Sequence, residues 1–302
     1  MQDATQARIA VIGLGNMGSG MAANLVKGGF SVVGCDFSPE RRAALEALGA
    51  KSTDDAASIV DQVDAVLLSL PGPKESEAVL LGEHGLIAKL RPGTAIINAS
   101  TISKELMLRL AEAAAARGID FLDAPVTGAA DGAAAGTLIF MIGCDEAVFD
   151  RWRPVFEPMA SVVQRMGDVG TGSAAKLLTN LLWFTHVIAI CDTMAAGVKA
   201  GISAEALQQL IPVSAGGTWV SNHDLPNILA DDDDASFTLA LCCKDLRLIR
   251  ELTSEMDALP LLLETVEGQF KAAMEQYGEQ GGELAVSRLT EARVGVSIRA
   301  AR

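Results

Sequence analysis

The chain has 302 residues, about twice the usual length of one domain, so it forms either one large domain or two ordinary ones. Half of the residues are hydrophobic and 21% are charged, which provides enough apolar surface for a large core and argues against a disordered chain. The formal net charge is -14, and an acidic chain repels nucleic-acid phosphates and anionic lipids. The composition therefore disfavours a protein that binds nucleic acid or a membrane surface, but it permits a small anionic ligand.

The five cysteines predict neither a disulfide framework nor a metal site. Their number is odd, no CxxC pattern occurs, and no histidine lies at metal-ligand spacing from them. Buried, reduced thiols of this kind are typical of a cytoplasmic protein. Residues 1–7 lack the pattern of a secretory signal, and Gly, Lys or Asn interrupts the longest apolar stretches. We therefore predict a cytoplasmic protein with no metal ion and no membrane-spanning helix.

Apolar runs of strand length alternate with helical patterns through the first half of the chain. The predicted strands are 8–13, 31–35, 65–70, 94–98, 119–122, 137–142 and 161–165. The predicted helices are 17–27, 39–48, 75–81, 104–117 and 146–157, with Ser38 and Pro39 as a helix start and Gly49 as its end. This alternation predicts a mostly parallel sheet with helices on both faces.

The second half of the chain has a helical pattern throughout. Residues 171–200 form an apolar run without proline, long enough for one mostly buried helix of about 45 Å. Further helices are predicted at 204–210, 224–229, 237–257, 261–277 and 283–289. The four aspartates 231–234 are interpreted as a solvated loop that caps a helix near Ser236, because adjacent side chains point in different directions.

A glycine-rich turn joins the first predicted strand to the first helix. It reads Gly13-Leu14-Gly15-Asn16-Met17-Gly18, in which the glycines permit a tight turn, close approach of a pyrophosphate and close packing of helix on strand. The helix N-terminus offers N–H groups to the phosphates. Asp36, at the end of the second strand, suits the adenine-ribose hydroxyls and repels a 2′-phosphate, although Arg41 and Arg42 leave NADP open.

These patterns together predict an α/β fold of two domains. Residues 1–168 are expected to form a Rossmann-type, doubly wound NAD-binding domain. Residues 169–302 are expected to form an all-α domain for substrate binding and oligomerisation, entered through a long interdomain helix. The glycine-rich stretch Gly167–Gly172 marks the boundary.

The acid/base group decides which oxidoreductase this is. The only tyrosine, Tyr277, is followed four positions on by Gly281, so the YxxxK pattern of short-chain dehydrogenases is absent. The histidines His84, His186 and His223 remain as bases, and His223 is the best placed of them.

Lys176 is the other candidate base. Lys176 and Asn180 are spaced i and i+4 on the long helix and share one face, among apolar neighbours. Burying a lone ammonium is costly and tends to lower the pKa of a lysine, which suits a group that exchanges a proton with a hydroxyl. A lysine that reaches the surface along its aliphatic chain fits the same pattern equally well.

Four blocks of sequence are similar to the β-hydroxyacid dehydrogenase family, which includes 3-hydroxyisobutyrate, tartronate semialdehyde and L-threonate dehydrogenases. The blocks are residues 9–23, 123–143, 167–180 and 244–246. The resemblance implies hydride transfer between NAD and C3 of a small 3-hydroxy acid in a cleft between the domains, with Lys176 as general acid/base and Asn180 bound to the reacting group. It also implies that Thr127 and Gly128 hold the substrate carboxylate, and the backbone amides around Thr127–Ala129 suit a compact anion site. The remaining cofactor contacts that it implies are Leu70, Pro71, Thr101 and Lys244.

The chain departs from the family at the carboxylate loop, where Thr127-Gly128-Ala129 replaces Ser-Gly-Gly. Ala129 is expected to avoid a positive φ, which would alter the loop. The block Gly216–Trp219 lies where the family has part of its substrate pocket, and the stretches 79–94 and 214–219 favour the L-threonate branch. Thr218, Trp219 and Asn222 suit hydrogen bonds to extra substrate hydroxyls and an ordinary domain interface equally well. A reductase of imines and a non-catalytic dinucleotide-binding protein are the alternatives. The apolar helices favour oligomerisation, and the resemblance implies a homodimer or homotetramer.

Overall fold

The computed structural model describes residues 7–299. The chain forms two compact units, Met1–Lys176 and Leu177–Arg302, which are described separately below. Six of the seven N-terminal residues on which the signal-peptide argument rests lie outside the described residues. The predicted domain boundary at 168/169 stays a prediction.

The first unit is built on one mostly parallel sheet. Its strands are β1 (Arg8–Ile12), β2 (Ser31–Cys35), β3 (Lys51–Thr53), β4 (Ala65–Leu68), β5 (Ala95–Asn98), β6 (Asp120–Asp123), β7 (Val126–Thr127), β8 (Leu138–Gly143) and β9 (Ala160–Gly167). Their order is β3-β2-β1-β4-β5-β6-β8-β7, and β9 pairs with β8. The six strands from β3 to β6 in this order are all parallel, whereas β8 runs antiparallel to β6 and β7. This is the predicted doubly wound arrangement.

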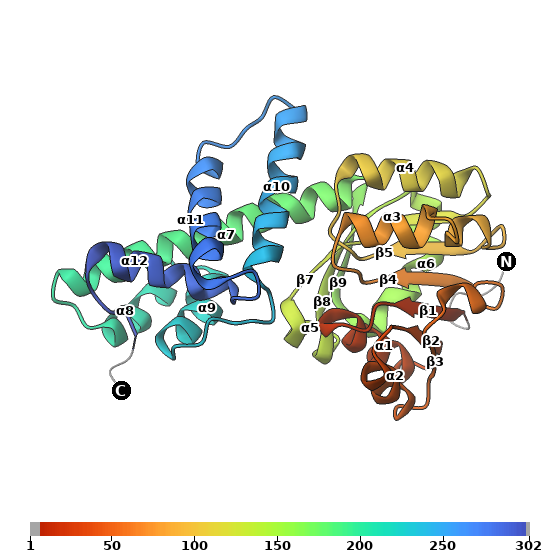
Figure 1. Ribbon diagram of the computed structural model, residues 1–302, viewed down its shortest axis with the longest axis horizontal. Helices are drawn as coiled ribbons and strands as arrows, with labels where there is room; N and C mark the ends of the chain where they lie inside the picture. Colours follow the sequence, from red (N-terminus) through yellow and green to blue (C-terminus); the bar gives the residue numbers. More distant parts are fainter. Residues whose placement is uncertain (1–6, 300–302) are drawn as a thin grey trace. The chain divides into compact units, whose positions relative to one another are not determined.

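Helices cover both faces of this sheet. They are α1 (Asn16–Lys27), α2 (Pro39–Glu46), α3 (Pro73–Leu81), α4 (Lys104–Ala115), α5 (Ala129–Ala135) and α6 (Glu146–Phe156). One face of the sheet packs on α1, α2 and α6 in a core that includes Leu25, Leu45 and Phe156. The other face packs on α3 and α4 through Leu80 and Leu110, and Figure 1 shows these two helices opposite α1 and α2. Alternate residues of each strand thus enter different cores.

Every strand and helix predicted for this unit is present, with ends that differ by a few residues, and three further short elements were not predicted. Ser38 caps α2 as expected, since its side chain accepts a hydrogen bond from Arg41 N–H. These unpredicted elements are β3, β7 and α5. Strand β7 has two residues and β3 has three, which is too short for an alternating pattern to show. Helix α5 reads AADGAAA, whose small residues form no apolar stripe.

The second unit is helical. Its elements are the distal part of α7 (Thr171–Lys199), α8 (Ala204–Leu210), α9 (Trp219–Leu229), α10 (Leu239–Glu255), α11 (Leu263–Tyr277) and α12 (Val286–Val294). Phe184 of α7 lies at its centre, with its ring 5.0 Å from those of Trp183 and Phe270. Helix α9 begins five residues earlier than predicted, because the side chains of Thr218 and Ser221 form a capping box and Pro226 is accommodated inside the helix.

Helix α7 corrects the expectation that no apolar segment reaches membrane-spanning length. Its 29 residues include a window of 18 with a mean hydropathy of 1.6, so by length and composition alone it is able to cross a membrane. Core helices of globular proteins pass the same test. The side chains of Leu177, Phe184, Val187 and Met194 are buried, and 33% of that window is buried, so packing accounts for part of its apolar character.

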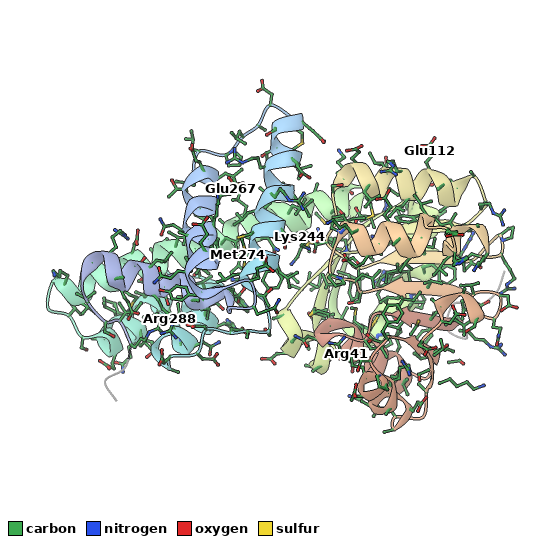
Figure 2. The ribbon with its side chains drawn as sticks, viewed as in Figure 1. Arg41, Glu112, Lys244, Glu267, Met274 and Arg288 are labelled. Atoms are coloured by element: carbon green, nitrogen blue, oxygen red, sulfur yellow. The ribbon has the colours of Figure 1, made fainter. Side chains whose placement is uncertain are left out.

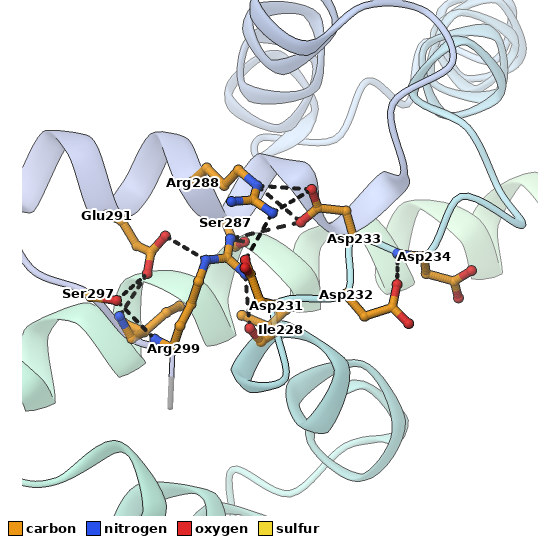
Figure 3. A network of polar contacts seen from close by, with 11 residues as sticks. Ile228, Asp231, Asp232, Asp233, Asp234, Ser287, Arg288, Glu291, Ser297 and Arg299 are labelled. Carbon is orange, nitrogen blue, oxygen red and sulfur yellow. Dashed lines mark hydrogen bonds and ion pairs between the residues drawn. The ribbon is translucent and has the colours of Figure 1, made fainter. Parts of the chain in front are cut away.

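The aspartate run Asp231–Asp234 also differs from the prediction. Asp231 and Asp233 form ion pairs with Arg288 of α12 and with Arg299, as Figure 3 shows. Helix α10 is capped by Thr238 rather than by the run. The run is therefore a partly buried ion-pair network that fastens the C-terminal segment, not a solvated cap. Its arginine partners are far away in sequence, which is why local pattern did not reveal them.

Candidate active site

The candidate cofactor residues of the first unit lie where parallel strands end. Gly13 follows β1, Asp36 follows β2, Leu70 and Pro71 follow β4, and Thr101 follows β5. Because these strands are parallel and adjacent, their carboxyl ends lie along one edge of the sheet. The chain adds β2 and β3 on one side of β1 and then β4, β5 and β6 on the other side. Ligands of doubly wound sheets bind at the point where the strand order switches in this way, here between β1 and β4.

The turn between β1 and α1 has the geometry of a phosphate-binding loop. Gly13 has φ +90°, and a Cβ at Gly18 would lie 1.9 Å from the carbonyl oxygen of Gly13, so both positions require glycine. A Cβ built at Gly15 meets nothing within 4 Å, so space is open on that side. No side chain caps the N-terminus of α1 at Gly15, and its first turn contains no acidic residue. These features fit the pyrophosphate of a dinucleotide.

Asp36 is held in place by its own loop. Its Oδ2 accepts a hydrogen bond from Leu14 N–H at 2.7 Å, and its Oδ1 accepts one from Ser38 N–H at 2.8 Å. Partial burial alone would raise the pKa of Asp36, but these two N–H donors and the neighbouring Arg41 outweigh burial and lower it. The side chain is therefore a fixed carboxylate next to the phosphate loop.

The two arginines behind Asp36 differ in their contacts. Arg41, labelled on α2 in Figure 2, lies 3.5 Å from Oδ2 of Asp36. Arg42 donates to the main-chain oxygens of Asp36 and Phe37 at 2.7 and 3.1 Å. Arg42 thus stabilises the loop, whereas Arg41 pairs with the carboxylate of Asp36 itself.

Ser100 joins the loops that follow β4 and β5. Its hydroxyl accepts a hydrogen bond from Leu70 N–H at 2.9 Å, and its own N–H donates to Oδ1 of the buried Asn98. The candidate residues Leu70 and Thr101 are thereby held on adjacent loops. The sequence analysis missed Ser100, although its place at the end of a buried strand, beside Thr101, was an available signal.

The candidate carboxylate loop contradicts the expectation for Ala129. Gly128 has φ +124° and Ala129 has φ +54°, at the start of α5. The loop therefore keeps a left-handed residue at this position despite the Cβ atom, at a cost in backbone strain. Helix α5 contacts α1 closely, since a Cβ at Gly20 would lie 2.7 Å from the carbonyl oxygen of Ala133.

Asp123 binds the beginning of α7 to the end of β6. Its Oδ2 accepts hydrogen bonds from the N–H groups of Gly170 and Ser173 at 3.0 and 2.8 Å. Its Oδ1 accepts one from the Ser173 hydroxyl at 2.7 Å. The side chain is fully buried, and burial raises its pKa to about 6 even though these donors oppose the shift. The sequence analysis assigned no role to Asp123.

Lys176 and Asn180 lie on one face of α7, as predicted from their spacing. Lys176 is half-buried and Asn180 is buried. Asn180 Nδ2 donates a hydrogen bond to Oδ2 of Asp245 on α10 at 2.8 Å. Asp245 also pairs with Lys244 at 3.0 Å, and Figure 2 labels Lys244 on α10. Asp245 was missed, although an acidic residue next to a candidate lysine in an apolar helical pattern was a signal.

The predicted pocket residues Thr218 and Trp219 lie at the start of α9. The Thr218 hydroxyl accepts a hydrogen bond from Ser221 N–H, so it is used at least in part as a helix cap. Half-exposed Trp219 stacks on His223, with ring centres 4.3 Å apart. Asn222 donates to the main-chain oxygen of Thr218 at 2.7 Å. Their hydrogen bonds are local to this helix end.

The cysteines have the environment of structural thiols. All five are free, and four of them are buried. Burial is the main cause that raises the pKa of Cys35 to about 11 and those of Cys144 and Cys191 to about 12. A thiolate nucleophile is disfavoured at each of these three positions.

Comparison with known proteins assigns both halves of the chain to one family. Residues 8–167 match the family model for the NAD-binding domain of 6-phosphogluconate dehydrogenase. Residues 170–290 match the family model described as NAD-binding of NADP-dependent 3-hydroxyisobutyrate dehydrogenase. The chain belongs to the β-hydroxyacid dehydrogenase family. It is accordingly an NAD(P)-dependent 3-hydroxyacid dehydrogenase with a Rossmann-type NAD(P)-binding fold.

Relatives of this dehydrogenase act on several different hydroxy acids. The 2-(hydroxymethyl)glutarate dehydrogenase of Eubacterium barkeri is 33% identical over 96% of this chain and 97% of its own. The NAD-dependent L-serine dehydrogenase of Pseudomonas aeruginosa is 36% identical over 81% of this chain and 84% of its own. The solved structure of 3-hydroxyisobutyrate dehydrogenase from Mycobacterium tuberculosis with L-serine has a TM-score of 0.85 and 32% identity, and it covers 94% of this chain and 99% of its own.

Proposed function

We propose that this dehydrogenase interconverts a small 3-hydroxy acid and its carbonyl form, with Lys176 as the general acid/base. The observation that carries this proposal is the Asp123 contact, because it fastens the helix of Lys176 to the strand that leads into the loop of Thr127 and Gly128. A proton-exchanging amine and an anion-binding loop are the two protein groups that the reaction needs. When bound, the nicotinamide takes up or returns the hydride at the carbon.

Each residue has a defined task in this proposal. Lys176 Nζ accepts the hydroxyl proton during oxidation and returns it during reduction. Asn180, whose amide is oriented by its bond to Asp245, holds the reacting oxygen. The Thr127 hydroxyl and the N–H groups of Gly128 and Ala129 bind the substrate carboxylate, because the start of α5 carries partial positive charge.

The proposed cofactor contacts of the first unit follow the edge of the sheet, and Lys244 is a separate candidate on α10. The residues proposed to hold the pyrophosphate and adenine ribose are Gly13, Leu14, Gly15, Asn16, Met17, Gly18 and Asp36. The residues proposed to contact the rest of the cofactor are Leu70, Pro71, Thr101 and Lys244. The fixed carboxylate of Asp36 favours the ribose hydroxyls of NAD over the 2′-phosphate of NADP.

The substrate is proposed to be of the L-threonate, 3-hydroxyisobutyrate or tartronate semialdehyde type. Thr218 and Trp219 are the residues proposed to distinguish among these acids. We further propose that the enzyme is a cytoplasmic homodimer or homotetramer that acts on free metabolites rather than on nucleic acid or membranes. Reduction of uncharged imines, or cofactor binding without turnover, would favour the alternative functions.

The test is Lys176→Ala, assayed by NADH formation over a panel of 3-hydroxy acids that includes L-threonate, 3-hydroxyisobutyrate and L-serine. General acid/base catalysis contributes roughly 10²- to 10⁴-fold, so kcat is expected to fall by about that factor while the Kd of NADH stays nearly unchanged. Lys199→Ala, at the other end of the same helix, is the control and is expected to retain turnover. Normal turnover in Lys176→Ala would show that another group exchanges the proton.

A further inference from the structure

Asp123 has an unusual environment for a carboxylate. It is fully buried at the end of β6, and its two oxygens accept three hydrogen bonds of 2.7 to 3.0 Å from Gly170 and Ser173. A buried carboxylate is costly unless such donors compensate it. All three donors belong to the segment that begins α7, so the side chain is committed to that helix start.

Glycines on both sides permit this close contact. A Cβ at Gly172 would lie 2.4 Å from the carbonyl oxygen of Met141 and 2.6 Å from that of Asp123. A Cβ at Gly143 would lie 3.1 Å from Oδ2 of Asp123 and 2.7 Å from the carbonyl oxygen of Asp168. The first turn of α7 is therefore pressed directly on the ends of β6 and β8, with no room for a Cβ atom between them.

Two segments of the proposed site begin at the contact of Asp123 with Gly170 and Ser173. Lys176 lies three residues beyond Ser173, which is less than one helical turn. In the other direction, β6 ends at Asp123, and β7, which ends at Thr127, begins three residues later. One side chain thus connects the backbone that carries the amine to the backbone that carries the anion-binding loop.

We propose that Asp123 is a positioning residue for Lys176: its carboxylate fixes the first turn of α7, and so fixes the amine relative to the loop of residues 127–129. The inference rests on the role proposed for Lys176. It assigns to Asp123 an effect on the chemical step, since a displacement of about 1 Å between reacting groups costs roughly 100-fold in rate.

The experiment compares Asp123→Ala with the conservative Asp123→Asn. Alanine leaves the N–H groups of Gly170 and Ser173 without their acceptor. Asparagine keeps an acceptor oxygen for both N–H groups, and its amide donates to the Ser173 hydroxyl, which turns from donor to acceptor. We expect kcat to fall at least 30-fold in Asp123→Ala and less than fivefold in Asp123→Asn, with the Kd of NADH within threefold of wild type in both.

Ser203→Ala is the matched control, because it removes the N-cap of α8, away from this contact. It is expected to lower the melting temperature without changing kcat. A purely architectural role of Asp123 predicts the same result for Asp123→Ala, namely lower stability with normal kcat per folded enzyme. That result would overturn the proposal.

A second variant and a second measurement keep the test decisive. Gly172→Ala leaves the carboxylate intact but pushes the first turn of α7 away, so it is expected to lower kcat as Asp123→Ala does. If neither variant folds, the contact is architectural and the proposal is wrong.

Amide hydrogen exchange of residues 170–176 is expected to be faster in Asp123→Ala than in wild type or Ser203→Ala. If wild-type enzyme turns over no 3-hydroxy acid, the proposed function fails, and the exchange rates still decide whether Asp123 holds this turn.

Discussion

Ala129 stores backbone strain at the candidate carboxylate loop. Its φ of +54° lies in the left-handed region, which costs a residue with a Cβ atom about 1 kcal/mol. The neighbouring Gly128 has φ +124° without this penalty. The strain falls on the loop to which we assign substrate binding, where the backbone conformation decides which N–H groups point at the ligand.

Ala129→Gly is therefore expected to stabilise the protein. Relief of the strain raises the free energy of unfolding by about 1 kcal/mol, or roughly 2–4 °C in melting temperature. Ala130→Gly is the matched control, since this residue has ordinary helical geometry and glycine there costs about 1 kcal/mol. Thermal unfolding of the three proteins measures the difference. Equal destabilisation by both glycines would mean that the loop is not strained in solution.

Asp36 is expected to decide the choice of cofactor. Asp36→Ala removes the acceptor proposed for the ribose hydroxyls and the charge that repels a 2′-phosphate. A hydrogen bond to a charged group contributes about 1.5–3 kcal/mol, so kcat/KM for NAD is expected to fall roughly 10- to 100-fold. For NADP, kcat/KM is expected to stay unchanged or to rise.

The control is Asp54→Ala, which removes a carboxylate that is exposed and lies 4.0 Å from Arg42. Initial rates with both cofactors are expected to match wild type in this variant. If Asp36→Ala keeps its preference for NAD, the discrimination lies elsewhere in the loop.

At the scale of elements, the second unit is fastened by an ion-pair network between distant segments. Arg299 is largely buried and contacts Glu291, Ser287, Asp231 and the main-chain oxygen of Ile228 (Figure 3). Asp233 binds Arg288 at the same place. The segment after α12 is thus bound both to α12 and to the loop after α9.

Removing Arg299 is expected to destabilise this unit strongly. Arg299→Ala leaves the carboxylates of Asp231 and Glu291 in a partly buried site without this partner, and breaking such pairs costs about 3 kcal/mol. Arg247→Ala, on the exposed side of α10, breaks only an i,i+4 pair with Glu251 and is expected to cost less than about 0.5 kcal/mol. Urea denaturation measures both variants. If Arg299→Ala and Arg247→Ala lower the free energy of unfolding by similar amounts, the network stabilises the protein no more than a surface ion pair does.

At the scale of the whole molecule, α7 keeps apolar side chains at its surface. Leu178 and Leu182, one turn apart, are 45% and 56% exposed. Neighbouring exposed leucines on an apolar helix are typical of a surface that binds a partner. This supports the proposed homo-oligomer, with α7 in the interface between copies.

Leu182→Glu is expected to shift the enzyme toward monomers. Burying one leucine contributes about 1.5–3 kcal/mol, and a symmetric dimer buries two copies, so dissociation is expected to increase more than 100-fold. Leu48→Glu is the control, because Leu48 is similarly exposed at 48% but follows α2 in the first unit. Sedimentation velocity at a series of concentrations measures both. If the Leu182→Glu protein sediments with the same mass as wild type, α7 does not form the interface between copies.

The sequence predicted most of the first unit because its signals are local. Gly13 and Gly18 are both required by one tight turn and stand five residues apart, and the sheet strands show as apolar runs without any long-range information. Lys176 and Asn180 share a face by helical spacing alone. The short elements β7 and α5 were missed, because two residues or a run of alanines carry no periodic signal.

Tertiary structure alone decided which polar groups act together. Asp123 reaches Gly170 and Ser173 some fifty positions along the chain, and Asn180 reaches Asp245 across an even larger gap. Asp231 and Asp233 likewise form ion pairs with Arg299 and Arg288, which are distant in sequence. Local pattern specifies backbone conformation, because glycine, capping and periodicity act over a few residues. The partner of a buried charge is specified only when the folded chain brings distant segments together and excludes water, since only then does an unpaired charge become costly.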